Sequence, residues 1–127
     1  MPAIQRHPTP HPVPFSKAVR AGDFLFLSGI LAMDAQANII EGDVQVQARA
    51  ILERIAATLA ECGAGMGQVV KATIWLADLN DFAAFNQEYA KHWPADCLPA
   101  RSCVQATLYR GAKVEIEVQA YVGEGRR

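Results

Sequence analysis

The stretch KVEIEVQAYV, residues 113–122, alternates apolar and polar side chains. Valine, isoleucine and alanine occupy every second position from Val114 to Ala120, with glutamate or glutamine between them. Because successive side chains of a β-strand point to opposite faces, this pattern predicts a strand with one buried face and one polar face. The apolar face needs a helical layer to cover it. The polar face is either solvated or packed against other subunits, and the pattern leaves both open.

Two amphipathic helices are predicted to cover the apolar face. After Asp43, a residue type that often begins helices, apolar residues recur at steps of three and four until Gly63, which is expected to end the helix. The residues of this stripe are Val44, Ala48, Ile51, Ile55, Leu59 and Cys62. A second helix is predicted to begin at Asp78 or Asn80. Its stripe consists of Phe82, Asn86, Tyr89 and Trp93.

The remaining strands are predicted on either side of the helices in the chain. Residues 15–29 indicate two strands around a turn at 21–23, with residues 24–29 buried. Residues 33–43 indicate a turn with a short strand, and residues 68–79 a strand rich in β-branched side chains. The last two strands, 101–109 and 113–122, are expected to be joined by a turn at Arg110-Gly111.

This order of elements predicts an α+β fold, in which two helices pack on one face of a mostly antiparallel sheet. The length of 127 residues suits a single domain spanning residues 1–127. Residues 1–14 contain five of the seven prolines, and we expect them to form an extended segment without regular structure.

Composition excludes several classes of function. The formal net charge of −1 disfavours nucleic-acid binding, which depends on many Lys and Arg contacts to phosphates. No apolar stretch approaches the roughly 20 residues that span a bilayer, so no membrane association is expected. The N-terminus lacks the apolar core of a secretory signal. The three cysteines have no paired spacing and are read as reduced thiols of a cytoplasmic protein.

Two charged residues near the C-terminal strands are candidates for chemistry. Arg101, in PARSCV (residues 99–104), could bind a small carboxylate through its planar guanidinium, or could be an ordinary surface arginine. Glu115 could orient or deprotonate a water molecule, or could be solvated. If the turn at Arg110-Gly111 joined the strands as a tight hairpin, these two residues would lie about 16 Å apart. They would then meet only across a subunit interface.

Other candidates carry a weaker signal. Cys103 could act as a nucleophile or be a small buried thiol, and Asn86 needs a hydrogen-bond partner if it is buried. His7 and His11 are separated by prolines, which makes a metal site between them improbable. The sequence has no glycine-rich phosphate loop and no zinc-ligand spacing, so neither a cofactor nor a metal is expected.

Several stretches together resemble the RidA (YjgF, reactive intermediate deaminase) family. The resemblance covers the chain from Pro14 onward. PFSKAVRAGDFLFLSG (residues 14–29) is similar to the entry strands of the family, and DLNDFAAFNQEYAKHW (residues 78–93) to its second helix. The combination of PARSCV with the later VEIEV (residues 114–118) is the most specific part.

The resemblance implies a chorismate-mutase-like fold and a homotrimer whose sheets form a central barrel, with clefts between the subunits. It also implies hydrolysis of 2-imino acids, derived from 2-aminoacrylate and 2-aminocrotonate, to 2-oxo acids and ammonia without a cofactor. Carried over by position, Arg101 would hold the substrate carboxylate and Glu115 would position the attacking water. The residues that would line the cleft are Phe15, Ser28, Gly29, Ile30, Asn86 and Cys103.

Three features differ from many members of the family. Phe15 replaces a tyrosine, Ile30 replaces a glutamine, and the connection from Arg101 to Glu115 is one residue shorter. These differences keep open a longer or more apolar substrate, as in the 2-aminomuconate deaminase branch. They also keep open a non-catalytic trimer that binds or senses small carboxylate metabolites. A ribonuclease or translation inhibitor is disfavoured by the net charge of −1.

Overall fold

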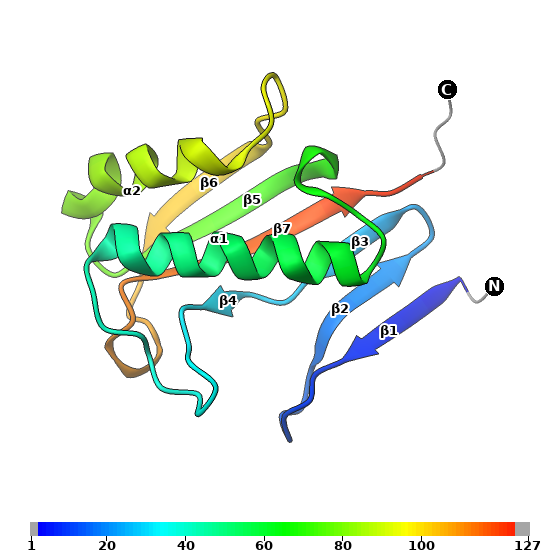
Figure 1. Ribbon diagram of the computed structural model, residues 1–127, viewed down its shortest axis with the longest axis horizontal. Helices are drawn as coiled ribbons and strands as arrows, with labels where there is room; N and C mark the ends of the chain where they lie inside the picture. Colours follow the sequence, from blue (N-terminus) through cyan, green and yellow to red (C-terminus); the bar gives the residue numbers. More distant parts are fainter. Residues whose placement is uncertain (1–2, 124–127) are drawn as a thin grey trace.

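The computed structural model describes residues 3–123, which form one sheet and the helices that pack on it (Figure 1). The helices are α1 (Val44–Glu61) and α2 (Phe82–Tyr89). The strands are β1 (Ile4–Pro8), β2 (Ser16–Ala21), β3 (Phe24–Leu27), β4 (Ile30–Leu31), β5 (Val69–Leu76), β6 (Ala100–Gln105) and β7 (Val114–Tyr121). Short 3₁₀ turns occur at Met66–Gln68, Leu79–Asp81, Ala90–His92 and Tyr109–Gly111.

The expected α+β fold is confirmed. The sheet has the order β1-β2-β3-β7-β5-β6, and β4 pairs with β7 next to β3. Only β5 and β6 run parallel among these pairs. Both helices lie on one face of the sheet (Figure 1), and alternate residues of β7, including Val114, Ile116 and Val118, are fully buried beneath them. Within residues 3–123, neither helix is long and apolar enough to cross a membrane.

The N-terminal segment departs from the prediction. Residues 1–14 were expected to lack regular structure, but Ile4–Pro8 forms β1, an edge strand antiparallel to β2. The register shifts between His7 and Pro8. The reason is the position of the prolines: Ile4–His7 contains none, so its N–H groups can pair with β2, whereas Pro8 sits where pairing becomes irregular at a strand end.

The second entry strand is only half buried, which corrects the prediction that residues 24–29 are buried throughout. Leu25 and Leu27 face the core, whereas Phe24 and Phe26 are 43% and 41% exposed. Strand alternation explains this, because a central strand covered by helices on one face still exposes its other face. Phe24 packs edge-on against Tyr121, with ring centroids 5.4 Å apart, so the exposed face carries an aromatic cluster rather than polar groups alone.

The predicted hairpin between the last two strands is wrong. β6 and β7 both pair with β5, which lies between them: β5 with β6 in parallel and β5 with β7 antiparallel. The connection turns at Tyr109–Gly111, where Arg110 adopts a left-handed conformation with φ of 51°. Alternation along a strand reveals which face is buried, but it contains no information on which neighbour the strand pairs with.

The two helices begin near the predicted residues. Asp43 caps α1 by accepting a 2.9 Å hydrogen bond from the N–H of Val46, and Gly63 follows the helix with a φ of +79°. Asp78 is one of the two residues at which the second helix was predicted to begin, and it caps the 3₁₀ turn that leads into α2. The stripe on α2 is partly wrong, since Phe85 is fully buried whereas Phe82 is 43% exposed.

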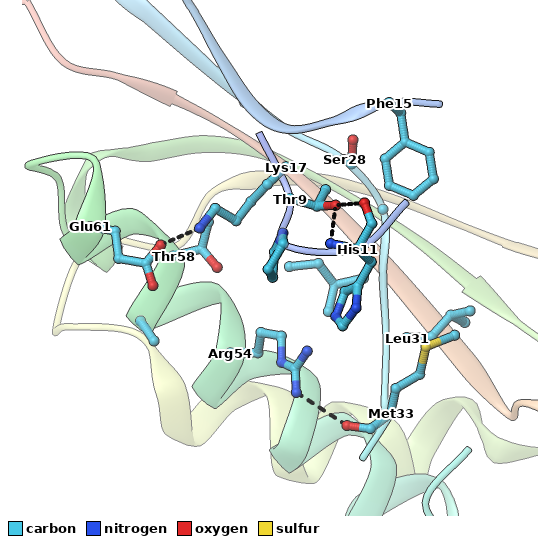
Figure 2. Close-up of a pocket in the computed structure, with 14 residues that line it drawn as sticks. Thr9, His11, Phe15, Lys17, Ser28, Leu31, Met33, Arg54, Thr58 and Glu61 are labelled. Carbon is cyan, nitrogen blue, oxygen red and sulfur yellow. Dashed lines mark hydrogen bonds and ion pairs between the residues drawn. The ribbon is translucent and has the colours of Figure 1, made fainter. Parts of the chain in front are cut away.

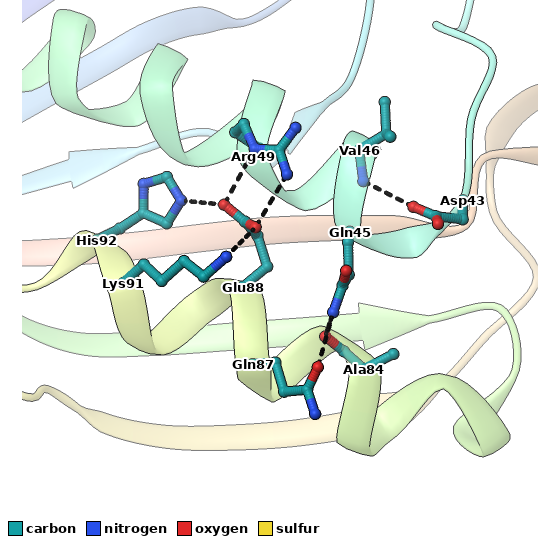
Figure 3. Close-up of polar contacts among 9 residues, drawn as sticks. All are labelled: Asp43, Gln45, Val46, Arg49, Ala84, Gln87, Glu88, Lys91 and His92. Atoms are coloured by element: carbon teal, nitrogen blue, oxygen red, sulfur yellow. Dashed lines mark hydrogen bonds and ion pairs between the residues drawn. The ribbon is translucent and has the colours of Figure 1, made fainter.

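A buried carboxylate joins the two helices (Figure 3). Glu88 of α2 is 2% exposed and accepts hydrogen bonds from Arg49 of α1, with Nη2–Oε1 and Nε–Oε2 distances of 3.2 and 3.3 Å. His92 lies 2.7 Å from Oε2, and Lys91 lies 3.5 Å from Oε1. The hydrogen bond to His92 is the main cause that lowers the pKa of Glu88 to about 2, while burial opposes the shift. Sequence patterns did not indicate this contact between helices.

We predict that Glu88→Gln lowers the free energy of unfolding by about 1–3 kcal/mol near neutral pH, because charge-assisted hydrogen bonds to a buried group are lost. The folded-state pKa of Glu88 is depressed, so its contribution is present above the pKa of an ordinary glutamate and is lost as the pH falls toward 2. The difference between wild type and variant should therefore shrink on acidification.

Urea unfolding at a series of pH values from about 7 to about 2 measures this difference. Glu53→Gln is the matched control, because Glu53 is exposed on the same helix as Arg49. A difference between wild type and Glu88→Gln that stays constant over the whole pH range would contradict the assignment.

Candidate functional site

Arg101 lies on the helix-covered side of the sheet, at the edge strand β6. It pairs in register with the fully buried Ala72 of β5, and residues paired in this way share a face. Its guanidinium carbon lies 4.9 Å from the centroid of the Tyr89 ring. The rings of Phe82 and Phe85 lie 5.5 and 5.7 Å away. Three aromatic side chains of α2 therefore surround one cation.

This aromatic cradle holds Arg101 without an acidic partner. Within residues 3–123, no carboxylate lies within ion-pair distance of its guanidinium. The faces of aromatic rings attract a cation through their quadrupole, but they accept none of its directional N–H bonds. The planar fork of donors therefore remains available to a carboxylate from outside the chain.

Cys103 lies on the same face as Arg101, two residues farther along β6, and pairs with Ile74. Burial raises the pKa of the Cys103 thiol, and the nearby Arg101 offsets this only in part. The protonated thiol is a poor nucleophile, so the sequence alternative of a small half-buried thiol suits the environment better. All three cysteines are free thiols.

Asn86 projects from α2, the helix that forms the aromatic cradle. Its Oδ1 is buried and has no hydrogen-bond partner among the described residues, and the same holds for the Tyr89 hydroxyl and Trp93 Nε1. Burial is also the main cause that raises the pKa of Tyr89 to about 12, so its hydroxyl stays protonated and can donate. Unpaired buried polar atoms are rare, which makes this side of α2 a place where a further molecule can supply partners.

Glu115 lies on the opposite face of the sheet. It pairs with Trp75 of β5 and Leu31 of β4, between the buried Val114 and Ile116. Burial is the larger cause that raises the pKa of the Glu115 carboxyl, and the neighbouring charge of Glu117 adds to it. A carboxylate whose pKa is raised is a stronger base than an exposed glutamate, and it can accept a proton from water more readily.

A glycine makes room for this carboxylate. A Cβ atom placed on Gly29 would overlap Oε2 of Glu115, so any side chain at this position would displace the carboxylate. Gly29 lies in the short link between β3 and β4, where the chain passes from pairing with one part of β7 to the next. The identity of residue 29 therefore controls where Glu115 can lie.

Four of the expected cleft residues line one pocket of about 440 Å³ (Figure 2). These are Phe15, Ser28, Gly29 and Ile30. Phe15 is 57% exposed, so its ring is available to a ligand or to another subunit. The Ser28 hydroxyl donates a 2.7 Å hydrogen bond to the carbonyl of Ser16 and is therefore already engaged.

The expected site residues thus form two separate groups. Arg101, Cys103 and Asn86 lie at β6 and α2, whereas Phe15, Ser28, Gly29, Ile30 and Glu115 lie around β4. Arg101 is in register with Ala72 and Glu115 with Trp75, three residues along β5 and two strands apart. Standard sheet spacings place their backbones about 14 Å apart, on opposite faces. The expected separation of about 16 Å assumed a hairpin between the last two strands, which is wrong. Arg101 and Glu115 nevertheless lie far apart within one chain.

Some relevant residues were missed by sequence reasoning. Phe82 and Tyr89 were assigned to a helical stripe without any role for Arg101, and Phe85 was left out of that stripe. The spacing of these three aromatic residues at steps of three and four on α2 was the available signal. Lys17 and Arg54 also line the pocket, and their positions in the sequence gave no indication of this.

Comparisons with known proteins agree with this fold. A family model described as Endoribonuclease L-PSP matches residues 6–122. The RutC family protein slr0709 of Synechocystis sp. is 44% identical over 124 residues, covering 94% of this chain and 95% of that protein. Reactive Intermediate Deaminase A, chloroplastic, of Arabidopsis thaliana is 42% identical over 106 residues, covering 82% of this chain and 56% of that protein.

A solved structure is similar over nearly the whole chain. NMB1025 of Neisseria meningitidis, described as a member of the YjgF protein family, superimposes with a TM-score of 0.84 at 32% identity. The superposition covers 96% of this chain and 97% of that one. With a family model that matches from β1 to the end of β7 and relatives that share its sequence and fold, the chain belongs to the RidA (YjgF) family.

Proposed function

We propose that this protein is a deaminase that hydrolyses 2-imino acids, and the enamines from which they form, to 2-oxo acids and ammonia. In this reaction water adds to the imine carbon, the carbon–nitrogen bond breaks, and ammonia leaves with the protons of the water. The name of the Arabidopsis relative, a reactive intermediate deaminase, supports the class of reaction. The 2-imino acid substrate is what the resemblance to the family implies.

The observation that carries the proposal is the separation of Arg101 from Glu115. Arg101 presents a cation without an acidic partner in the described chain, which suits the carboxylate of a 2-imino acid. Glu115 presents a carboxylate with a raised pKa, which suits activation of water. A small substrate cannot contact both within one chain, so we place the proposed site between two copies, in the homotrimer that the family resemblance implies.

The roles of the other residues follow from their positions. Gly29 leaves room for the Glu115 carboxylate, and Phe15 and Ile30 are apolar residues of the pocket that Gly29 also lines. Cys103 lies next to Arg101 along its strand and contributes mainly its backbone, since its thiol is protonated. An imine is already electrophilic, so orienting the water and the substrate can supply several kcal/mol of the lowering of the barrier.

A nucleic-acid substrate is the less favoured alternative, although the matching family model carries the word endoribonuclease. The net charge of −1 provides no excess of basic residues for phosphate contacts. The proposed chemistry assigns a role both to Arg101, which has no ion-pair partner among residues 3–123, and to the basic Glu115.

Complementation between two inactive variants tests the shared site. Arg101→Ala and Glu115→Gln should each abolish most imine hydrolysis, because each removes one half of every site. When equal amounts are co-refolded into trimers, about one quarter of the shared sites receive both intact residues, so about 25% of wild-type activity should return.

To measure hydrolysis, an amino acid oxidase generates the imines. Semicarbazide then traps the imine that has not been hydrolysed. Light scattering verifies that each variant and the mixture are trimers. Arg101→Ala that is refolded alone by the same procedure is the control. Mixtures that remain inactive although they are trimeric would contradict a site shared between copies, and single variants that keep full activity would place the residue outside the mechanism.

The rate should fall on the acid side with an apparent pKa above that of an ordinary glutamate. The reason is that Glu115 must be deprotonated to accept a proton, and both burial and Glu117 raise its pKa. Glu117→Gln removes the second cause, so it should move the acid limb of kcat/KM to lower pH. An acid limb that persists unchanged in Glu115→Gln would assign it to another group.

Gly29→Ala should lower kcat at least tenfold while changing the unfolding free energy much less, because the added methyl group displaces the Glu115 carboxylate from its position. Gly65→Ala is the matched control, since a Cβ there meets no atom within 4 Å. Steady-state kinetics and urea unfolding of both variants measure the two effects. Full activity in Gly29→Ala would show that the observed position of Glu115 is not required.

A further inference from the structure

The helix α2 is short, and polar contacts from α1 fix its position (Figure 3). With eight residues it is below the length at which isolated helices are stable in water, so its place depends on packing. Gln45 of α1 donates a 2.8 Å hydrogen bond to the carbonyl of Ala84. Near the end of α2, Arg49 donates hydrogen bonds to both carboxylate oxygens of Glu88, at 3.2 and 3.3 Å. Such a two-bonded contact fixes direction as well as distance.

The charged network around Glu88 does more than join two helices. The Glu88 side chain is 2% exposed, and Arg49, Lys91 and His92 all lie within ion-pair distance of it. Removing charges from water costs free energy, and apolar side chains of similar volume often replace buried ion pairs without loss of stability. Directional hydrogen bonds hold one geometry, whereas apolar contacts allow sliding. The network is therefore better explained by the geometry that it fixes than by stability alone.

That geometry includes the aromatic rings beside Arg101. The residue after Glu88 is Tyr89, whose ring centroid lies 4.9 Å from the guanidinium carbon of Arg101. Phe85 packs against Tyr89 with ring centroids 5.4 Å apart, and its own ring lies 5.7 Å from the same carbon. A helix with its side chains is about 10–12 Å across, so rotating α2 by about 20° moves a ring at its surface by about 2 Å.

A shift of this size is enough to release Arg101. The attraction between a cation and an aromatic ring acts within about 6 Å of the ring centroid. A displacement of about 2 Å away from the guanidinium takes the rings of Phe85 and Tyr89 beyond this range. Within residues 3–123, Arg101 has no carboxylate at ion-pair distance, so the attraction that holds its guanidinium comes from the rings of α2.

We propose that Glu88 is a positioning residue for the candidate site. By fixing α2 on α1, it holds the aromatic cradle against Arg101 and thereby directs the guanidinium toward a substrate carboxylate. The inference rests on the proposed function for the role of Arg101. Glu88 itself is buried against α1, and its effect on the reaction is exerted through Tyr89 and Arg101.

Steady-state kinetics of Glu88→Gln tests this inference. Because Arg101 binds the carboxylate before and during the reaction, its misplacement should raise KM about tenfold and leave kcat within about twofold of wild type. A purely structural role gives the opposite pattern, since partial unfolding lowers the active fraction, and therefore kcat, without changing KM. A KM equal to that of wild type would overturn the inference while the proposed function stands.

The double variant Arg49→Met with Glu88→Met separates position from stability. Two apolar side chains replace the buried ion pair, so urea unfolding should show a stability near that of wild type. KM should nevertheless be raised about tenfold, because apolar contacts do not fix the rotation of α2. A double variant with the stability and the KM of wild type would overturn the inference. This variant also provides the test if Glu88→Gln does not form stable trimers.

Leu59→Ala is the matched control for loss of stability. Leu59 is fully buried on α1, ten residues beyond Arg49 and about 15 Å away along the helix axis. The variant should lose stability through the cavity that it creates, while its KM stays that of wild type. An equal rise of KM in Leu59→Ala would attribute the effect of Glu88→Gln to a general loss of stability, and so overturn the inference.

Binding measurements distinguish failure of this inference from failure of the proposed function. If wild type hydrolyses no imine, calorimetry compares a 2-oxo acid with the uncharged 2-oxo amide of equal chain length. Glu88→Gln should weaken binding of the acid about tenfold and leave binding of the amide unchanged, because only the acid uses the guanidinium fork. Equal weakening of both ligands overturns the inference, as does a wild type that binds the acid no more tightly than the amide.

Discussion

The position of β5 between β6 and β7 is the constraint on which the candidate site depends. Because β5 pairs with both strands, it sets the register of Arg101 through Ala72 and that of Glu115 through Trp75. Arg101 shares the buried face of Ala72, whereas Glu115 alternates with buried residues and points the other way. The two residues are thus held on opposite faces of a rigid sheet, and no side-chain rotation within one chain can bring them to a common small molecule.

The position of α2 depends on a second interaction, between helices. Glu88 is bound by Arg49 of α1 and by His92, and the next residue along the chain is Tyr89, whose ring lies closest to the Arg101 guanidinium. The same helix therefore uses one side for an ion-paired contact with α1 and another side for the aromatic cradle. This arrangement couples the packing of the two helices to the position of the candidate carboxylate-binding residue.

Some features of this structure were predicted from the sequence and others were missed. Alternation in residues 114–120 and the cap at Asp43 predicted a one-sided sheet and the beginning of α1, because both depend on local periodicity and local hydrogen bonds. Phe85 was missed and Phe82 placed in the core because a helical stripe can be drawn through either residue. The role of Gly29 came from family resemblance, and only the contact with Glu115 supplies its physical reason.

The sequence by itself determined the class of fold, the buried face of β7, and the residues that carry charge near the C-terminal strands. These properties follow from spacing along the chain. The tertiary structure alone decided that β5 separates β6 from β7, that Arg101 lies in an aromatic cradle, and that Arg54 borders the pocket beside Gly29. Strand order and contacts between distant segments depend on the joint packing of all the elements, and the local pattern of one segment is compatible with several neighbours.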